Sequence, residues 1–162
     1  MQPPPPGDED GRSKSRPGGL VGRAEIEVDF GDCDPAQIVF YPNYFRWFDR
    51  GTWRLFAAAG LSRDTLRERY GLTGHPIVKA GAEFFVSSRP GDRIVVETSV
   101  TRWGGKSFDL RHVISKSDGR LVAEGFETRV WAVADPDDPT RMRGGRVPDE
   151  VIALFGGTRE ER

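Results

Sequence analysis

Residues 24–60 read AEIEVDFGDCDPAQIVFYPNYFRWFDRGTWRLFAAAG and decide the fold. The first seven residues alternate between apolar and acidic side chains, as a half-buried strand requires, and one face of it is formed by Ala24, Ile26, Val28 and Phe30. The loop that follows contains two prolines and leads to Asn43, which can cap a helix that runs to about Ala59 and ends at Gly60. Small and apolar residues at steps of three and four predict that this helix packs deep against a sheet: Tyr44, Trp47, Phe48, Gly51, Leu55 and Ala58.

The rest of the chain predicts a short helix and then a run of strands. The helix begins at Ser62 as its cap, reaches Tyr70 and ends at Gly71. Alternating segments between turn residues predict four strands, over residues 77–86, 93–102, 107–116 and 121–134, of which the last three form an antiparallel meander. Residues 135–146 predict a surface excursion before a last turn at 148–155. We therefore expect an α+β fold in which one sheet face wraps the long helix, while the other face or an edge pairs with a second subunit.

Composition limits the domain count and the class of ligand. The 162 residues carry 24 Lys and Arg against 25 Asp and Glu, without the basic face or tail of a nucleic-acid binder. No apolar stretch approaches the roughly 20 residues that a membrane-spanning helix needs. Residues 1–19 contain five of the twelve prolines and no core-forming side chain, which predicts a disordered tail before a single domain at 20–162. A single cysteine is typical of a reducing compartment, so a cytoplasmic location is expected.

Several residues that could carry chemistry are weak candidates. His112 is in step with Phe108, Leu110 and Ile114, which favours a packed core histidine over a catalytic one. His75 lies between Gly74 and Pro76 at the start of a strand. The sequence is equally compatible with a His75 that lines a binding site and with one that is an ordinary loop residue. Cys33 lies between two aspartates, whose charge disfavours a reactive thiolate. The consecutive Asp32, Cys33 and Asp34 cannot all face one ion, so no metal site is expected.

Asp34 is the stronger candidate because its loop leads into the start of the long helix. The first turn of a helix collects unpaired backbone N–H groups and the positive end of the helix dipole. A carboxylate and a site for a developing oxyanion could therefore meet here. Spacing alone leaves open a second interpretation, in which Asp34 only forms an Asx turn before Pro35.

Three segments resemble one enzyme family. The stretch VDFGDCDPAQIVFYPNYFRWF, which ends at Phe48, strongly resembles the opening motif of the 4-hydroxybenzoyl-CoA thioesterase family, and the resemblance continues through residues 74–78 and 106–108. It covers most of the chain from about residue 24 to 134. The resemblance implies a hotdog fold, a curved antiparallel sheet wrapped around one long central helix, in agreement with the element order predicted from the periodicity.

The resemblance also implies roles for individual residues. Asp34 is expected to be the catalytic carboxylate, as nucleophile or general base, while the backbone N–H near Tyr41 polarises the thioester carbonyl. Asp49 and His75 are expected near the acyl group, although Asp49 could equally be a solvated or capping carboxylate. Two departures from the family pattern concern the loops. Gly104 and Gly105 stand where the family carries paired arginines. The CoA phosphates are therefore expected to bind to Lys106, or to Arg102 as a substitute. In the loop after Asp34, Gln37 replaces a glycine.

The expected function is hydrolysis of an acyl-CoA thioester, with an aromatic acyl group favoured, to the free acid and CoA. The resemblance implies no metal and no cofactor beyond CoA as part of the substrate, and a homodimer or homotetramer whose site lies between subunits. Two alternatives remain at this point. One is a thioesterase for short or branched acyl-CoA or for acyl-carrier-protein substrates, and the other is a non-catalytic acyl-CoA binding protein, against which Asp34 argues because a binder needs no ionised carboxylate.

Overall fold

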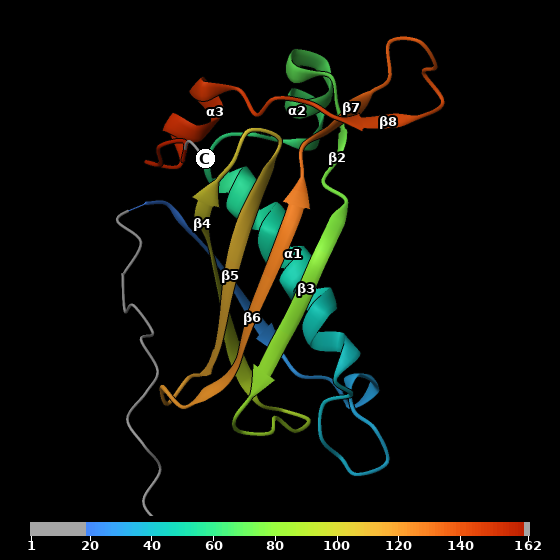
Figure 1. Ribbon diagram of the computed structural model, residues 1–162. Helices are drawn as coiled ribbons and strands as arrows, with labels where there is room; N and C mark the ends of the chain where they lie inside the picture. The colour runs from blue at the N-terminus through green and yellow to red at the C-terminus, as the bar shows by residue number, and fades with distance from the viewer. Residues whose placement is uncertain (1–18, 161–162) are drawn as a thin grey trace, which may run out of the picture.

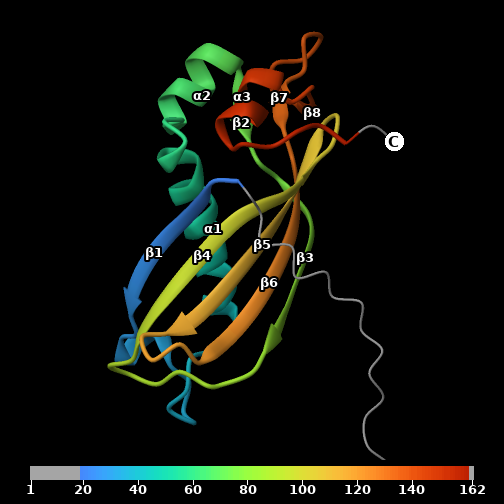
Figure 2. The ribbon, with the colours of Figure 1, turned by 90° about the vertical axis from the view of Figure 1, so that its left-hand side faces the viewer.

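The structure is a computed structural model that describes residues 19–160. A five-stranded antiparallel sheet with strand order β1-β4-β5-β6-β3 curves around the long helix α1, which lies along its inner face (Figure 1; Figure 2). Its strands are β1 (Val21–Glu27), β3 (Ile77–Phe84), β4 (Arg93–Trp103), β5 (Ser107–Lys116) and β6 (Leu121–Val130). This arrangement confirms the α+β class and the sheet wrapped around one helix.

The first strand begins and ends three residues earlier than its alternation predicts. Ala24, Ile26 and Val28 are buried as expected, but β1 ends at Glu27 and the chain turns into a short 3-10 helix, η1 (Phe30–Asp32). The amide of Asp29 donates to Oδ2 of Asp32 (3.0 Å), which holds this turn. Because the strand ends before Phe30, its side chain does not join the buried face and is 81% exposed.

Helix α1 (Pro42–Ala58) confirms the predicted central helix, with one difference at its start. Tyr41 occupies the N-cap position and proline the first turn, whereas Asn43, expected as the cap, is buried inside that turn. Its side chain amide donates instead to the carbonyl of Asp32 (2.8 Å), so it ties the helix to the preceding loop. The second helix, α2 (Arg63–Tyr70), has the predicted Ser62 cap and ends at Gly71 in the left-handed conformation.

The predicted meander is present as β4-β5-β6, but its last strand is broken. Residues 121–134 divide into β6 and a short β7 (Ala132–Ala134), which leaves the main sheet and joins β2 (Leu72–Gly74) and β8 (Met142–Gly144) in a second sheet. The final helix α3 (Asp149–Leu154) falls within the predicted last turn. This second sheet lies at one end of the molecule with α2 and α3, opposite the loop between β1 and α1 (Figure 1).

The core divides into two hydrophobic clusters along α1. One surrounds Phe48 near the start of the helix and the other surrounds Phe56 near its end. Between them lies a set of buried polar residues on the inner face of the sheet, comprising Thr98, His112, Glu127 and Arg129. Helix and sheet approach closely at this level because Gly51 and Gly125 have no side chain: a Cβ on Gly125 would collide with the ring of Phe48.

The N-terminal tail expected at 1–19 lies outside the described residues except for Gly19. Leu20 donates its amide to the carbonyl of Phe155 (3.0 Å) and packs on the core. Among residues 19–160, no helix is long and apolar enough to cross a membrane.

Candidate active site

The loop that carries Asp34 is a compact hairpin of the backbone. The amide of Asp34 donates to the carbonyl of Ile38 (2.9 Å), and that of Gln37 donates to the carbonyl of Asp34 (2.8 Å). Cys33 and Val39 pair across it as an antiparallel bridge. Gln37 has a φ of 59°, in the left-handed region that favours glycine, which explains why a glycine fits this position of the motif. The loop thus holds Asp34 in a defined place before α1.

The Asp34 carboxylate is half-buried and held by one oxygen. Its Oδ1 accepts a hydrogen bond from the amide of Ala36 (2.9 Å), so the Asx turn that spacing suggested is present. No other residue between 19 and 160 donates to its second oxygen, Oδ2. The two interpretations of Asp34 are therefore compatible, because the turn fixes the side chain through one oxygen and leaves the other for chemistry.

Tyr41 places a backbone N–H at the start of α1. Asn43 and Tyr44 donate their amides to the carbonyls of Phe40 and Tyr41, but the Tyr41 amide itself has no acceptor within the described part of the chain. The residue is 61% exposed and lies at the positive end of the helix dipole. Such a donor can stabilise negative charge on a carbonyl oxygen.

Cys33 and the two histidines do not form a nucleophilic system. Partial burial raises the pKa of the Cys33 thiol, and the nearby carboxylates Asp32 and Asp34 raise it further. His112 is fully buried, which confirms the core histidine that its periodicity favours. These residues therefore supply no activated thiolate or exposed imidazole.

His75 is buried among aromatic rings and does not line an open site in this chain. It stacks on Trp53 (centroids 5.3 Å apart) and contacts Phe56, Phe108 and Trp131. Neither ring nitrogen has a hydrogen-bond partner among the described residues. Burial, and to a lesser degree the charge of Arg129, lowers the pKa of His75 to about 3, so the ring is neutral. The geometry does not support the expected contact between His75 and the substrate.

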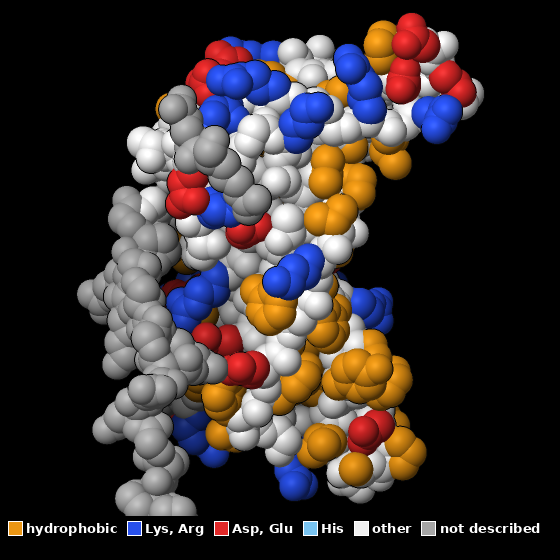
Figure 3. Space-filling view, in the orientation of Figure 1, with side chains coloured by type: hydrophobic (Ala, Val, Ile, Leu, Met, Phe, Trp, Pro, Cys, Tyr) orange, Lys and Arg blue, Asp and Glu red, His pale blue; other side chains and the backbone are white. Residues whose placement is uncertain are grey.

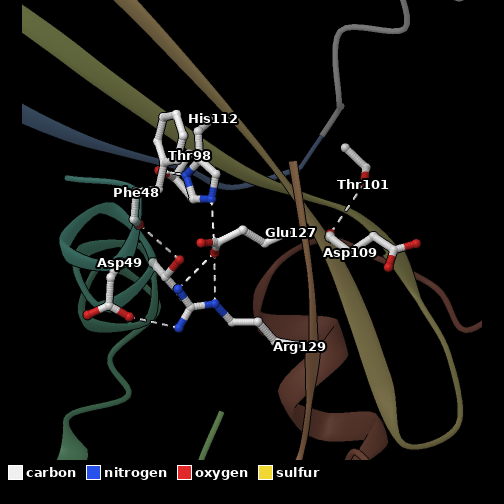
Figure 4. A network of polar contacts seen from close by, with 9 residues as sticks. Phe48, Asp49, Thr98, Thr101, Asp109, His112, Glu127 and Arg129 are labelled. Carbon is white, nitrogen blue, oxygen red and sulfur yellow. Dashed lines mark hydrogen bonds and ion pairs between the residues drawn. The ribbon is translucent and has the colours of Figure 1, made fainter. Parts of the chain in front are cut away.

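Asp49 projects from α1 and forms an ion pair with a buried arginine. Its Oδ1 accepts a hydrogen bond from Nη1 of Arg129 (2.9 Å), while half of its side chain remains exposed (Figure 4). Asp49 lies in a surface hollow of about 650 Å³ with Phe45, Trp53 and several arginines. The sequence did not predict this ion pair, and the exposed half of the side chain remains in contact with solvent.

Sequence reasoning missed the arginines of this hollow and the arginine beneath it. Arg46, Arg50 and Arg54 follow one another every fourth residue on α1, and Arg63 stacks its guanidinium on Trp53 (4.3 Å). The spacing of four is a signal that the sequence contains, because such residues share one helix face. No spacing in the sequence indicated the contact between Arg129 and Asp49, since the two residues are 80 positions apart in the chain.

The two cations expected to hold the CoA phosphates differ in their surroundings. Arg102 donates from Nε to Oδ2 of Asp109 (2.6 Å). Burial alone would raise the pKa of the Asp109 carboxyl, but hydrogen bonds from Arg102 and Thr128 lower this pKa below its usual range. Arg102 is thus neutralised by an ionised partner. Lys106 is exposed, and no ion pair ties it to a residue between 19 and 160. Of the two, Lys106 is the cation available to an anion.

Within the described residues there is no group of three or more His, Cys, Asp or Glu side chains placed to hold a metal ion.

Comparison with known proteins agrees with this geometry. Residues 28–153 match the profile of the thioesterase-like superfamily. The chain is 40% identical over 133 residues to the 4-hydroxybenzoyl-CoA thioesterase of Pseudomonas sp. (strain CBS-3), an alignment that covers 78% of this chain and 92% of that protein.

Solved structures give the same relationship. The structure of 4-hydroxybenzoyl CoA thioesterase from Pseudomonas sp. strain CBS-3 superposes with a TM-score of 0.75 at 38% identity, over 83% of this chain and 99% of that one. A gentisyl-coenzyme A thioesterase, BH1999, gives a TM-score of 0.69 at 32% identity over the same fractions. The profile, the relative and the shared architecture show that this chain belongs to the thioesterase-like superfamily and is a thioester hydrolase with the hotdog fold.

Proposed function

We propose that the substrate is an aromatic acyl-CoA, of the 4-hydroxybenzoyl type, and that Asp34 is the catalytic carboxylate. The observation that carries the proposal is the Asp34 side chain, held by one oxygen in a fixed loop just before a helix-start N–H that has no acceptor among residues 19–160. A 4-hydroxybenzoyl CoA thioesterase 37% identical to this chain has been solved in complex with 4-hydroxybenzoyl CoA as a mutant in which asparagine replaces one aspartate.

The chemistry follows from these two groups. The Tyr41 N–H donates to the thioester carbonyl oxygen and stabilises the negative charge that develops there. In the nucleophilic route, an Asp34 oxygen bonds to the carbonyl carbon, the C–S bond breaks, and CoA leaves as a thiolate that takes a proton from solvent. Water then hydrolyses the resulting anhydride and restores the carboxylate.

In the general-base route, Asp34 takes a proton from a water molecule whose oxygen bonds to the same carbon. The C–S bond breaks as before, and the departing thiolate receives the proton from Asp34. Both routes use protein groups alone, with CoA entering only as part of the substrate. Because a thiolate is a good leaving group, neither route needs a strong general acid, in keeping with the burial of both histidines.

We propose further that the active unit is a homodimer formed through β3, or a tetramer built from it. Strand β3 is at the end of the sheet, and within residues 19–160 it pairs on one side only, with β6. Hydrophobic side chains gather on the β3 side of the molecule (Figure 3), and among those at least 47% exposed are Ile77, Val78, Phe84, Phe85 and Phe126. An unpaired edge with exposed apolar side chains is a template for pairing with a second chain. A cytoplasmic location is consistent with the free Cys33 thiol.

The test is thiol release from a panel of acyl-CoA substrates: 4-hydroxybenzoyl, benzoyl, gentisyl, short aliphatic and branched. We expect the highest kcat/KM for a hydroxylated aromatic group. Preference for short or branched chains would support the second enzyme interpretation, and binding without turnover would support the non-catalytic one.

The Asp34→Asn variant should bind acyl-CoA but turn over about 10² to 10⁴ times more slowly, the usual value of a positioned acid or base. Cys33→Ser, one residue away in the same loop, is the matched control and should retain most activity because its thiol stays protonated. Near wild-type turnover of Asp34→Asn, purified free of wild-type enzyme, would disprove the assignment.

A further inference from the structure

A chain of polar contacts crosses the inner face of the sheet and reaches the surface at Asp49 (Figure 4). The hydroxyl of Thr98 lies 2.9 Å from Nδ1 of His112, and Nε2 of His112 lies 3.2 Å from Oε2 of Glu127. Arg129 donates from Nε to the same Glu127 oxygen (2.8 Å) and from Nη1 to Asp49 (2.9 Å). The contacts thus run from β4 through β5 and β6 to α1.

The protonation states within the chain follow from burial and partners. Burial alone would raise the pKa of Glu127, but the hydrogen bond from His112 and the charge of Arg129 lower it below its usual range, so Glu127 is ionised. Burial lowers the pKa of His112, so its ring is neutral. Because an ionised carboxylate only accepts, Nε2 of His112 carries the hydrogen, and Nδ1 accepts from Thr98.

The chain of contacts contains one more carboxylate than guanidinium. One guanidinium lies between two carboxylates, of which Glu127 is fully buried and Asp49 is half exposed. The second carboxylate, Asp49, lines the hollow together with Phe45 and the arginines of α1. Arg129 occupies only Oδ1 of Asp49, and no residue between 19 and 160 donates to Oδ2.

Asp49 is also placed within reach of an acyl group bound at the helix start. It lies eight residues beyond Tyr41, about 12 Å along the helix axis, and helical side chains point back toward the N-terminus. A carboxylate oxygen at this distance can accept from a hydroxyl on the far side of an aromatic ring whose carbonyl lies at the Tyr41 amide.

We propose that Arg129 is a positioning residue that fixes the Asp49 carboxylate for a hydroxyl donor on the acyl group, with Thr98, His112 and Glu127 holding Arg129 in place. The proposal rests on the proposed function and deepens it, because it assigns selection of hydroxylated over unsubstituted aromatic acyl groups to residues buried behind the site. The alternative is that the buried chain only stabilises the fold.

The test compares hydrolysis and binding of 4-hydroxybenzoyl-CoA and benzoyl-CoA. Arg129→Met alone would leave the Glu127 charge buried without its partner and could unfold the protein. The informative variant is therefore the pair Glu127→Gln with Arg129→Met, which removes both charges and keeps an acceptor for His112. Arg129→Lys is the conservative variant, which keeps the charge but not the planar fork that reaches both carboxylates.

We expect the selectivity, the ratio of kcat/KM for the hydroxylated over the unsubstituted substrate, to fall about tenfold or more in the paired variant. Turnover of benzoyl-CoA should remain within about threefold of wild type, and Arg129→Lys should be intermediate. Adding Asp49→Ala to the paired variant should lower the ratio no further, since Asp49 is already free to turn away.

A folded paired variant with wild-type selectivity would overturn the proposal and leave only a structural role for Arg129. Equal losses for both substrates would overturn it as well. Affinities measured for the two substrates in the Asp34→Asn background separate this inference from the proposed function. If the wild-type enzyme hydrolyses aromatic acyl-CoA but Asp49 has no effect on its preference between the two substrates, only this inference is contradicted. If aromatic acyl-CoA is neither bound nor hydrolysed, the proposed function is contradicted too.

Discussion

At the scale of single residues, the loop that carries Asp34 combines a fixed carboxylate with a strained backbone. Asp34 is held through one oxygen by the amide of Ala36, and the turn that does so requires Gln37 in the left-handed region. A non-glycine residue in that conformation costs on the order of 1 kcal/mol. The loop geometry is therefore maintained by its surroundings, such as the bond from Asn43 to the carbonyl of Asp32.

Gln37→Gly should raise the free energy of unfolding by about 0.5 to 1 kcal/mol, because glycine adopts positive φ without a steric penalty. The gain is partly offset by the larger entropy of glycine in the unfolded chain. Urea unfolding measures the change, and Ala36→Gly, next to it in the same loop, is the control that should destabilise. A loss of stability in Gln37→Gly would mean that the Gln37 side chain makes a contribution larger than the backbone strain.

Lys106 is the second residue whose surroundings lead to a prediction. It is exposed without an ion pair to the described residues, whereas Arg102 is paired with Asp109. Lys106→Ala should raise the KM for acyl-CoA several-fold and leave kcat nearly unchanged, because a contact with the CoA phosphates is equal in ground and transition states. A truncated acyl-pantetheine thioester, which lacks the nucleotide, is the control substrate and should show little change. An equal change in KM for both substrates would contradict a phosphate contact.

At the scale of elements, two buried neutral histidines join α1 to the strands and make stability depend on pH. The folded protein holds the pKa of His75 at about 3, far below the ordinary value near 6.5 of the unfolded chain, and burial lowers that of His112 in the same direction. Between these values the unfolded state binds more protons than the folded state. Stability is therefore complete above about pH 6.5 and falls as the pH is lowered toward 3.

Between pH 6 and pH 4 the free energy of unfolding should fall by about 1.4 kcal/mol per pH unit for each histidine that stays neutral. His75→Phe should remove one such contribution and flatten the slope by about that amount, whatever its effect on stability at pH 7. Thermal or urea unfolding at several pH values measures both slopes. An unchanged slope in His75→Phe would show that His75 is protonated in the folded state.

The elements that sequence could predict are those with a strong period. Helix α1 and strands β4, β5 and β6 repeat their apolar residues over many positions, so their type was correct and their ends were within a few residues. Strands β2 and β8 have three residues each, too few for a period, and exist because β7 pairs with both. Phe30 was misplaced because the alternation continues in the sequence after the strand has ended.

Prediction of the site was limited in a different way. Asp34 could be proposed as a site residue because its motif and its neighbouring helix start are local in the sequence. The partnership of Asp49 with Arg129 could not, since it depends on how the helix crosses the sheet. Glu127 and Arg129 occupy alternate positions of β6 and share a face with its apolar residues, which is the one local sign that charges are buried there.

At the scale of the whole molecule, the sheet has two ends with different character. In the part of the chain that the structure describes, both end strands pair on one side only, β1 with β4 and β3 with β6. The inward residues of β1 are buried by α1, whereas every residue of β3 is at least partly exposed, including the apolar Ile77 and Val78. A monomer with this surface would present an open hydrophobic edge, which proteins usually cover or charge. The asymmetry predicts which edge meets the second subunit.

Val78→Lys should weaken the dimer, because Val78 is 63% exposed on β3 and a charge there opposes pairing of two copies. Val21→Lys, on the other end strand and 43% exposed, is the matched control and should leave the assembly unchanged. Light scattering after size exclusion, over a range of protein concentrations, gives the mass in solution. We expect wild type and Val21→Lys to be dimers or larger. Val78→Lys should dissociate at a protein concentration at least about tenfold higher than the concentration at which wild type and Val21→Lys dissociate.

The same samples link assembly to catalysis. If each site needs the neighbouring subunit, the specific activity of Val78→Lys should fall as the enzyme is diluted and should follow the dissociation curve, since Asp34 and Tyr41 are unaltered in each separated chain. A monomeric Val78→Lys with full activity would show that one chain contains the complete site. A wild-type protein that is monomeric at all concentrations would contradict the assignment of β3 as an interface, and the cover for its apolar edge would then have to come from another protein.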